Sequence, residues 1–166
     1  MIPVMPNVFD PEFEPSRGEP APFQARGAEI GMQAGSRDLG ASLYELPPGQ
    51  AIAPFHIHHN NEEMLIVIAG RPTLRTLDSE RELAPGDVVS FPAGREGAHR
   101  VDNQADGPAR VLMLSTMNEV DVVEYPDSGK VLARSRSRNP DGSLPPGAFR
   151  LMVRTDAGLD YYDGEV

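Results

Sequence analysis

The chain has 166 residues, of which 39% are hydrophobic, and this fits one globular domain with a core of its own. Its 25 acidic residues against 15 basic ones give a formal net charge of −10, so we expect neither nucleic acid nor an anionic membrane surface to bind it. The absence of cysteine excludes disulfides, thiolate metal sites and cysteine nucleophiles.

The N-terminal segment, residues 1–26, is expected to form an extended arm, because its many prolines disfavour a helix. It has neither the basic start nor the apolar stretch that a signal peptide needs. No part of the chain approaches the roughly 18 consecutive apolar residues of a membrane-spanning helix. We therefore expect a cytoplasmic protein, with which the lack of cysteine is compatible.

Short runs rich in β-forming residues follow the arm, and glycine and proline separate them. Many short strands at such spacing predict an all-β sandwich or barrel, which we place at residues 27–126. Residues 127–166 are expected to be an extension that packs on this barrel, with the alternating Arg134, Arg136 and Arg138 in a solvated loop. The predicted strands are residues 39–46, 51–58, 63–69, 73–77, 88–91, 99–101, 109–117 and 121–125.

Two of these predicted strands are apolar on both faces. In residues 63–69, Leu65 and Val67 share the face of Glu63, whereas the even-numbered residues, also apolar, point the other way. A strand of an antiparallel sandwich normally has one solvent-exposed face, so a second apolar face must be covered by another part of the structure. The cover is a second sheet layer, the N-terminal arm or another subunit, and of these we favour a homodimer.

The most informative segment contains three of the four histidines. In a strand, His56 and His58 project to the same side, about 7 Å apart along the backbone. After a short turn, Glu63 begins a very apolar strand, where a carboxylate is costly to bury unless it is paired or binds a metal. Two imidazoles and a carboxylate suit a divalent transition metal, and His99, at the start of another strand, is the candidate for a fourth ligand.

These residues resemble the two motifs of the cupin superfamily. The first, G-x5-H-x-H-x3,4-E-x6-G, is matched by the segment from Gly49 to Gly70, with one additional residue after Gly49. The second, G-x5-P-x-G-x2-H-x3-N, is matched by the segment from Gly86 to Asn103, with two additional residues after Gly94. Both insertions lie in turns, where they cost little. The resemblance covers about residues 39–126 and, more narrowly, is to small bacterial single-domain cupins of unassigned activity.

The resemblance implies a double-stranded β-helix, the cupin jelly-roll barrel, with a mononuclear site in its mouth. It implies one divalent transition metal per chain (Fe, Mn, Zn or Ni), with His56, His58, Glu63 and His99 as ligands. Asn103 is expected in a structural role or beside the ligands. His59 and Glu62 have the opposite strand parity, so we expect them to be exposed or to lie behind the ligands.

A metal in such a site leaves coordination positions open for a small molecule. We therefore expect a metal-dependent enzyme of dioxygenase, isomerase or lyase type, acting on a small oxygen-rich molecule. Tyr44 and Arg75 are the candidates for a catalytic acid or base, and an apolar funnel of residues such as Leu65, Val67, Phe55 and Phe91 should surround the site. The alternatives are a non-catalytic binding or sensor module and a structural protein with an idle site.

Overall fold

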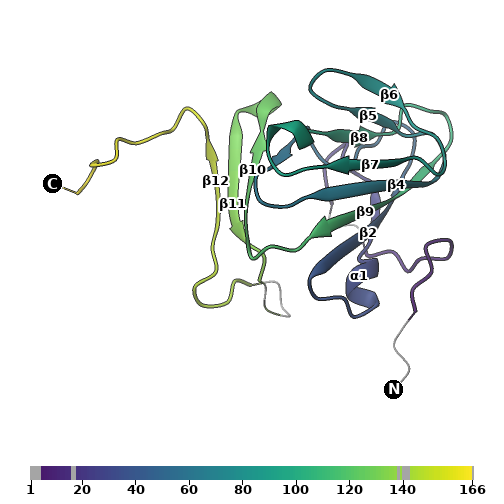
Figure 1. The fold of residues 1–166 in the computed structure, drawn as a ribbon, viewed down its shortest axis with the longest axis horizontal. Helices are drawn as coiled ribbons and strands as arrows, with labels where there is room; N and C mark the ends of the chain where they lie inside the picture. The colour runs from purple at the N-terminus through teal and green to yellow at the C-terminus, as the bar shows by residue number, and fades with distance from the viewer. Residues whose placement is uncertain (1–4, 16–17, 138, 140–142, 166) are drawn as a thin grey trace.

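The strands of the computed structural model form three antiparallel sheets (Figure 1). The model describes residues 5–15, 18–137, 139 and 143–165. The largest sheet has the order β1 (Arg26–Ala28), β2 (Leu39–Leu46), β9 (Ala109–Thr116), β4 (Glu63–Ala69), β7 (Val88–Phe91). The second sheet has the order β12 (Arg150–Arg154), β11 (Lys130–Ser135), β10 (Val120–Tyr125), β3 (Ile57–His58), and the third has the order β6 (Glu80–Glu82), β5 (Thr73–Arg75), β8 (Arg100–Asp102).

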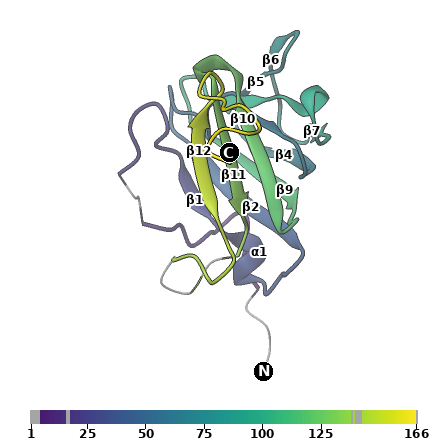
Figure 2. The same cartoon turned by 90° about the vertical axis from the view of Figure 1, so that its left-hand side faces the viewer.

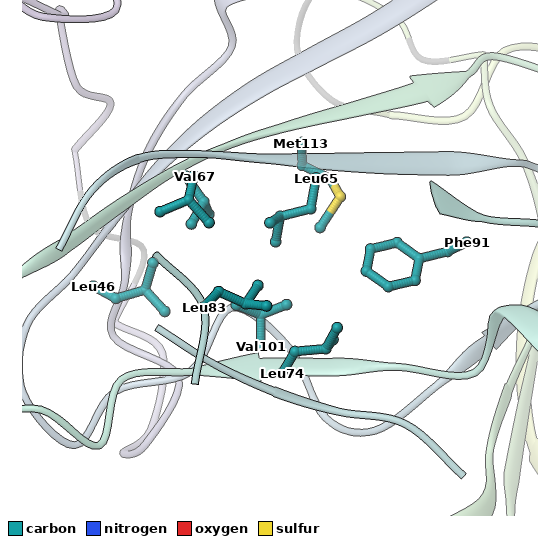
Figure 3. Packing of buried hydrophobic residues seen from close by; sticks show 9 residues of the cluster. Leu46, Leu65, Val67, Leu74, Leu83, Phe91, Val101 and Met113 are labelled. Carbon is teal, nitrogen blue, oxygen red and sulfur yellow. The ribbon is translucent and has the colours of Figure 1, made fainter. Parts of the chain in front are cut away.

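The main core lies between the five-stranded and the three-stranded sheets (Figure 3). Leu65 and Val67 of β4 and Val111 of β9 face Leu74 of β5 and Val101 of β8, and all of them are at most 3% exposed. Apolar side chains of two sheets thus interdigitate, as in other sandwiches. This arrangement confirms the predicted all-β fold, a double-stranded β-helix.

The four-stranded sheet closes one end of this sandwich, at the left of Figure 1, and faces the viewer in Figure 2. Its β3 and β10 come from the predicted barrel, and β11 and β12 come from the predicted C-terminal extension. The expected loop is therefore wrong at Arg134, which lies within β11. Arg136 follows the strand and is half-buried, and it donates hydrogen bonds to the carbonyl groups of Met117 and Arg37. Arg138 lies outside the described residues. Beyond β12 the chain leaves the barrel, and Leu159, Tyr161 and Tyr162 are exposed.

The N-terminal arm and a short helix, α1 (Ile30–Gln33), cover part of the outer face of the five-stranded sheet. Val8 and Phe13 of the arm pack near Ile68 of β4 and Leu112 of β9. Arg110 of β9 donates hydrogen bonds to the carbonyl groups of residues 8 and 9, which ties the arm to the sheet. The second apolar face predicted from the sequence is thus covered in part by the chain itself.

Each of the eight predicted strands coincides with or overlaps an observed strand, and residues 39–46, 63–69 and 88–91 match in full. The predicted strand 51–58 narrows to β3, preceded by isolated bridges at Ala51 and His56. The sequence did not indicate β1, β6, β11, β12, α1 or the 3-10 turns η1 (Arg95–Gly97) and η2 (Pro126–Ser128). No helix among the described residues is long and apolar enough to cross a membrane.

Candidate metal centre

His56 and His99 are joined through their backbones at the end of the sandwich. The amide of each donates a hydrogen bond to the carbonyl of the other, at 3.1 Å from His56 and 3.0 Å from His99. Directly before His99, the η1 turn closes tightly, because a Cβ at Gly97 would lie 1.9 Å from the carbonyl oxygen of Pro92. Only glycine therefore allows the approach that brings the His99 ring beside the His56 ring, with 4.5 Å between centroids.

The imidazoles of three histidines converge on one carboxylate oxygen. Glu63 Oε2 lies 3.4 Å from His58 Nε2, 3.4 Å from His99 Nε2 and 3.9 Å from His56 Nε2. His56, His58 and Glu63 each offer one ligand atom, and these atoms all lie within 4.8 Å of one another. Two ligand atoms held about 2.1 Å from one ion are about 3.0–3.4 Å apart, so the observed spacing is close to that of a metal site.

The other ring nitrogen of each histidine has an oxygen partner. Nδ1 of His56 lies 2.8 Å from the carbonyl oxygen of Pro54, and Nδ1 of His99 lies 2.9 Å from that of Gly97. Because a carbonyl only accepts, Nδ1 carries the proton in both rings, and the lone pair of Nε2 is directed at the centre of the cluster.

His58 has a stronger partner, since its Nδ1 lies 2.5 Å from Oδ2 of Asp121 on β10. Asp121 is 3% exposed and accepts a second hydrogen bond from the amide of Asn60. A carboxylate behind an imidazole orients the ring and increases its basicity, as in many metal sites. The sequence analysis missed Asp121; its only signal was an acidic residue inside the apolar run of residues 120–123.

Two of the imidazoles are neutral at neutral pH. Burial, followed by the charge of His58, lowers the pKa of His56 to about 4. Burial and the charge of His56 lower the pKa of His99 to about 3. Neutral imidazole is the form that binds metal ions, so neither ring has to lose a proton first.

His58 and the two carboxylates titrate differently. Burial lowers the pKa of His58, but the Asp121 hydrogen bond and the charges of Glu63 and Asp121 together raise it. Burial raises the pKa of Glu63, and the charge of His58 opposes this only in part. For Asp121, burial is again the largest influence, but its hydrogen bond and ion pair with His58 hold its pKa below the usual value. Burial thus opposes the charge on Glu63, and a cation bound beside this carboxylate would offset that cost.

A cavity of about 270 Å³ opens onto the four candidate ligands. Its apolar lining includes Val101, Met113, Val123 and Leu132. The residues expected in the funnel were wrong: Leu65, Val67, Phe55 and Phe91 do not line this cavity, whereas Val101 and Met113 belong both to its lining and to the main core. Phe91 instead stacks on the His99 ring, with 3.8 Å between centroids and 10° between planes.

The two catalytic candidates lie in different places. Tyr44 lines the cavity, and burial, together with the charge of Glu29, raises its pKa to about 12. Arg75 is not among the residues that line the described cavities; it forms two hydrogen bonds with Asp127 and lies over the ring of Phe55. The sequence missed two further polar groups of the cavity, Tyr125 and Arg134.

The neighbours of the candidate ligands point away from the cavity. His59 is exposed and contacts Glu124, with 3.3 Å between Nε2 and Oε2. Glu62 is also exposed and accepts a hydrogen bond from Ser90. Asn103 is fully buried, and its side chain joins the backbone at Leu46, Gly107 and Ala105 through three hydrogen bonds.

The candidate site lies in the part of the chain that is similar to a known family. Residues 42–115, which include all four candidate ligands, match the model of the cupin domain. This part of the chain is therefore similar to the cupin family. Among curated proteins, none matches the chain.

Solved structures resemble a large part of the chain. A candidate sugar phosphate isomerase from Acidithiobacillus ferrooxidans is 25% identical, with a TM-score of 0.74 over 89% of this chain and 86% of that one. A sugar phosphate isomerase of the cupin superfamily from Silicibacter pomeroyi is 22% identical, with a TM-score of 0.73 over 95% of this chain and 97% of that chain. A polyketide cyclase from Streptomyces resistomycificus is 21% identical, with a TM-score of 0.56 over 68% of this chain and 78% of that one.

Proposed function

We propose that this protein is a metal-dependent enzyme that acts on a small oxygen-rich molecule by isomerase, lyase or dioxygenase chemistry. The observation that carries the proposal is the convergence of three Nε2 atoms on Glu63 Oε2, at 3.4–3.9 Å, beside a cavity of about 270 Å³. His56, His58, Glu63 and His99 would hold one divalent transition metal per chain.

The donor set fits such an ion. Three imidazole nitrogens and one carboxylate oxygen accept Fe, Mn, Zn or Ni, and no softer ligand is available in a chain without cysteine. All three Nδ1 atoms have an oxygen partner, so each Nε2 is free to bind. A metal held there would polarise a carbonyl or hydroxyl oxygen of a substrate that enters the cavity.

The polar groups of the cavity favour an enzyme over a passive binding module. An apolar pocket would only shelter a ligand, whereas Tyr44, Tyr125 and Arg134 line this one. With its pKa raised to about 12, Tyr44 keeps its proton at neutral pH and can donate it to an oxygen of the substrate. Burial also raises the pKa of Tyr125, so the same role is open to it.

The structural relatives support the isomerase alternative. The candidate sugar phosphate isomerase matches 89% of this chain at 25% identity, and its substrate class is rich in hydroxyl and carbonyl oxygens. Non-catalytic binding of a similar molecule is the alternative, in which the metal would be a docking point.

Turnover by the metal-loaded protein tests the proposal. We would incubate it with a panel of sugar phosphates and hydroxy acids, follow the mixture by proton NMR, and record oxygen uptake with an electrode. Conversion of a panel member that stops with EDTA and in His99→Ala is the expected result, and oxygen uptake would assign dioxygenase chemistry. A ligand that binds in the cavity and is never converted would contradict the enzyme and establish the binding module.

We also propose that the protein is a homodimer. The arm and α1 leave Met64 and Ile66 of β4 and Leu114 of β9 half-buried on the outer face, and Leu39 beside them is 54% exposed. A second copy would cover these side chains. Light scattering after gel filtration should give twice the mass of the chain, and Met64→Glu should halve it. A monomer at every concentration would contradict the dimer.

A further inference from the structure

The cavity-facing side of the four-stranded sheet carries a row of cations. Residues directly opposite each other in an antiparallel pair share a face, and Tyr125 of β10 lies opposite Lys130 of β11. On the same face of β11, Leu132 and Arg134 line the cavity. Lys130 therefore belongs to the face that looks onto the candidate metal centre.

The next strand extends this row. Arg150 of β12 lies opposite Arg134, and Arg154 lies opposite Lys130. Both side chains are exposed, as is the whole of β12. The inner face of β11 and β12 thus carries Lys130, Arg134, Arg150 and Arg154, in a chain whose net charge is −10.

Arg134 is the member of this row that reaches the cavity. Across the strands it faces Asp121, but that carboxylate is already bound to His58 and to the amide of Asn60. Within the described part of the chain, the Arg134 guanidinium has neither a hydrogen bond nor an ion pair. Arg110, by contrast, is paired with Glu45 at 2.6 Å.

Several of these cations act on Tyr125, whose side chain lines the cavity. Lys130 Nζ lies 5.5 Å from the centroid of its ring. Burial raises the pKa of the Tyr125 phenol, and the charges of Arg134 and Arg150 both oppose that rise. Three cations therefore act at a side chain that lines the same cavity as the candidate ligands.

We propose that Arg134, with Arg150 and Lys130 beside it, forms an anion subsite that binds the phosphate or carboxylate group of the substrate. The guanidinium offers several donors in a plane, which suits the oxygens of either group. The positive row also attracts an anion toward a cavity in an otherwise acidic protein. This inference rests on the proposed function and adds to it that the substrate carries a negative charge.

Anion titrations test the subsite separately from the metal. Inorganic phosphate and acetate would each be titrated by calorimetry at low salt into EDTA-dialysed and metal-loaded protein. We expect at least one of them to bind the EDTA-dialysed form, and the one that binds more tightly identifies the group that the subsite takes. Metal content, measured on the same samples, tests the proposed function on its own, and anion binding by a protein without metal would still support the subsite.

Substitutions assign the binding to these residues. Arg134→Gln should weaken it about tenfold, Arg150→Gln should weaken it less, and Arg134→Lys should restore part of it because the charge returns. The matched control is Arg81→Gln, an exposed arginine of β6 with a distant carboxylate partner at 3.9 Å, which should bind as the wild type does. The subsite is overturned if neither anion binds either form of the wild type, or if Arg134→Gln binds as tightly as Arg81→Gln in samples with equal thermal stability.

Discussion

His58 and Asp121 form the shortest contact of the candidate centre, 2.5 Å between Nδ1 and Oδ2, although 63 residues separate them in the chain. The contact fixes the proton of His58 on Nδ1 and directs Nε2 toward Glu63. Asp121 thus acts on a metal through the imidazole, as a positioning residue that does not itself bind the ion.

Asp121→Asn should therefore weaken metal binding about 10- to 100-fold and leave the barrel folded. An amide has the size of the carboxylate but lacks the charge that holds His58 in place. Competition with a chromogenic chelator measures the affinity. Glu124→Gln is the matched control, because Glu124 contacts His59 on the opposite face of the same two strands and should leave the affinity unchanged. Equal affinities in the two variants would show that Asp121 has no part in the site.

Truncation of Leu65 should destabilise the core between the sheets. This side chain is fully buried among the apolar residues of both sheets, so Leu65→Ala should lower the free energy of unfolding by about 2–5 kcal/mol. Val88→Ala on the neighbouring strand β7 is the control, because Val88 is 58% exposed and should change it by less than about 0.5 kcal/mol. Urea unfolding of both variants measures the free energy of unfolding. A similar decrease in the two variants would contradict the placement of Leu65 in the core.

The metal-free protein should lose stability in mild acid. Folding lowers the pKa of His56 from 6.5 to about 4 and that of His99 to about 3. Between those values and 6.5 the unfolded chain binds more protons, so the stability that these two histidines contribute is complete above pH 6.5 and is lost as the pH falls through this window. The raised pKa of His58 contributes stability that is lost only as the pH rises above 6.5, and the raised pKa of Glu63 opposes the decline in acid.

Thermal unfolding of EDTA-treated protein over this pH range tests whether the stability falls as the pH falls. The Tm of the wild type should fall as the pH drops from about 7 to about 5, and His99→Asn should flatten the slope. His59→Asn is the control, since His59 is exposed and lies outside the cluster. A slope that is the same in all three proteins would contradict the buried, neutral state of His99.

Strand parity made the candidate ligands predictable. His56 and His58 are two residues apart in one predicted strand, so the alternation of side chains puts them on one face, and Glu63 begins the next strand directly after a short turn. Parity does not tell how far along that face a side chain lies. Leu65 and Val67 share the face of Glu63, as expected, yet they lie deeper between the sheets and not at the cavity.

The sequence did not predict which residues of distant strands lie beside the candidate ligands. Asp121 and Arg134 approach the histidines only because β10 pairs with both β3 and β11, and no local pattern states that pairing. Arg134 of β11 and Arg136 directly after it alternate with small residues where the chain is partly exposed, so this segment resembles a solvated loop. The prolines of the arm predict an extended segment, but they do not predict that Phe13 packs on the sheet.

Elemental analysis of protein purified without added metal tests whether the three histidines and Glu63 hold a metal ion. We expect close to one divalent transition metal per chain in the wild type and in His59→Ala. We expect nearly complete loss of metal in His56→Ala and in His99→Ala, both of which should keep the circular dichroism of a folded barrel. A wild type without metal, or full occupancy in both of these variants, would contradict the assignment of the site.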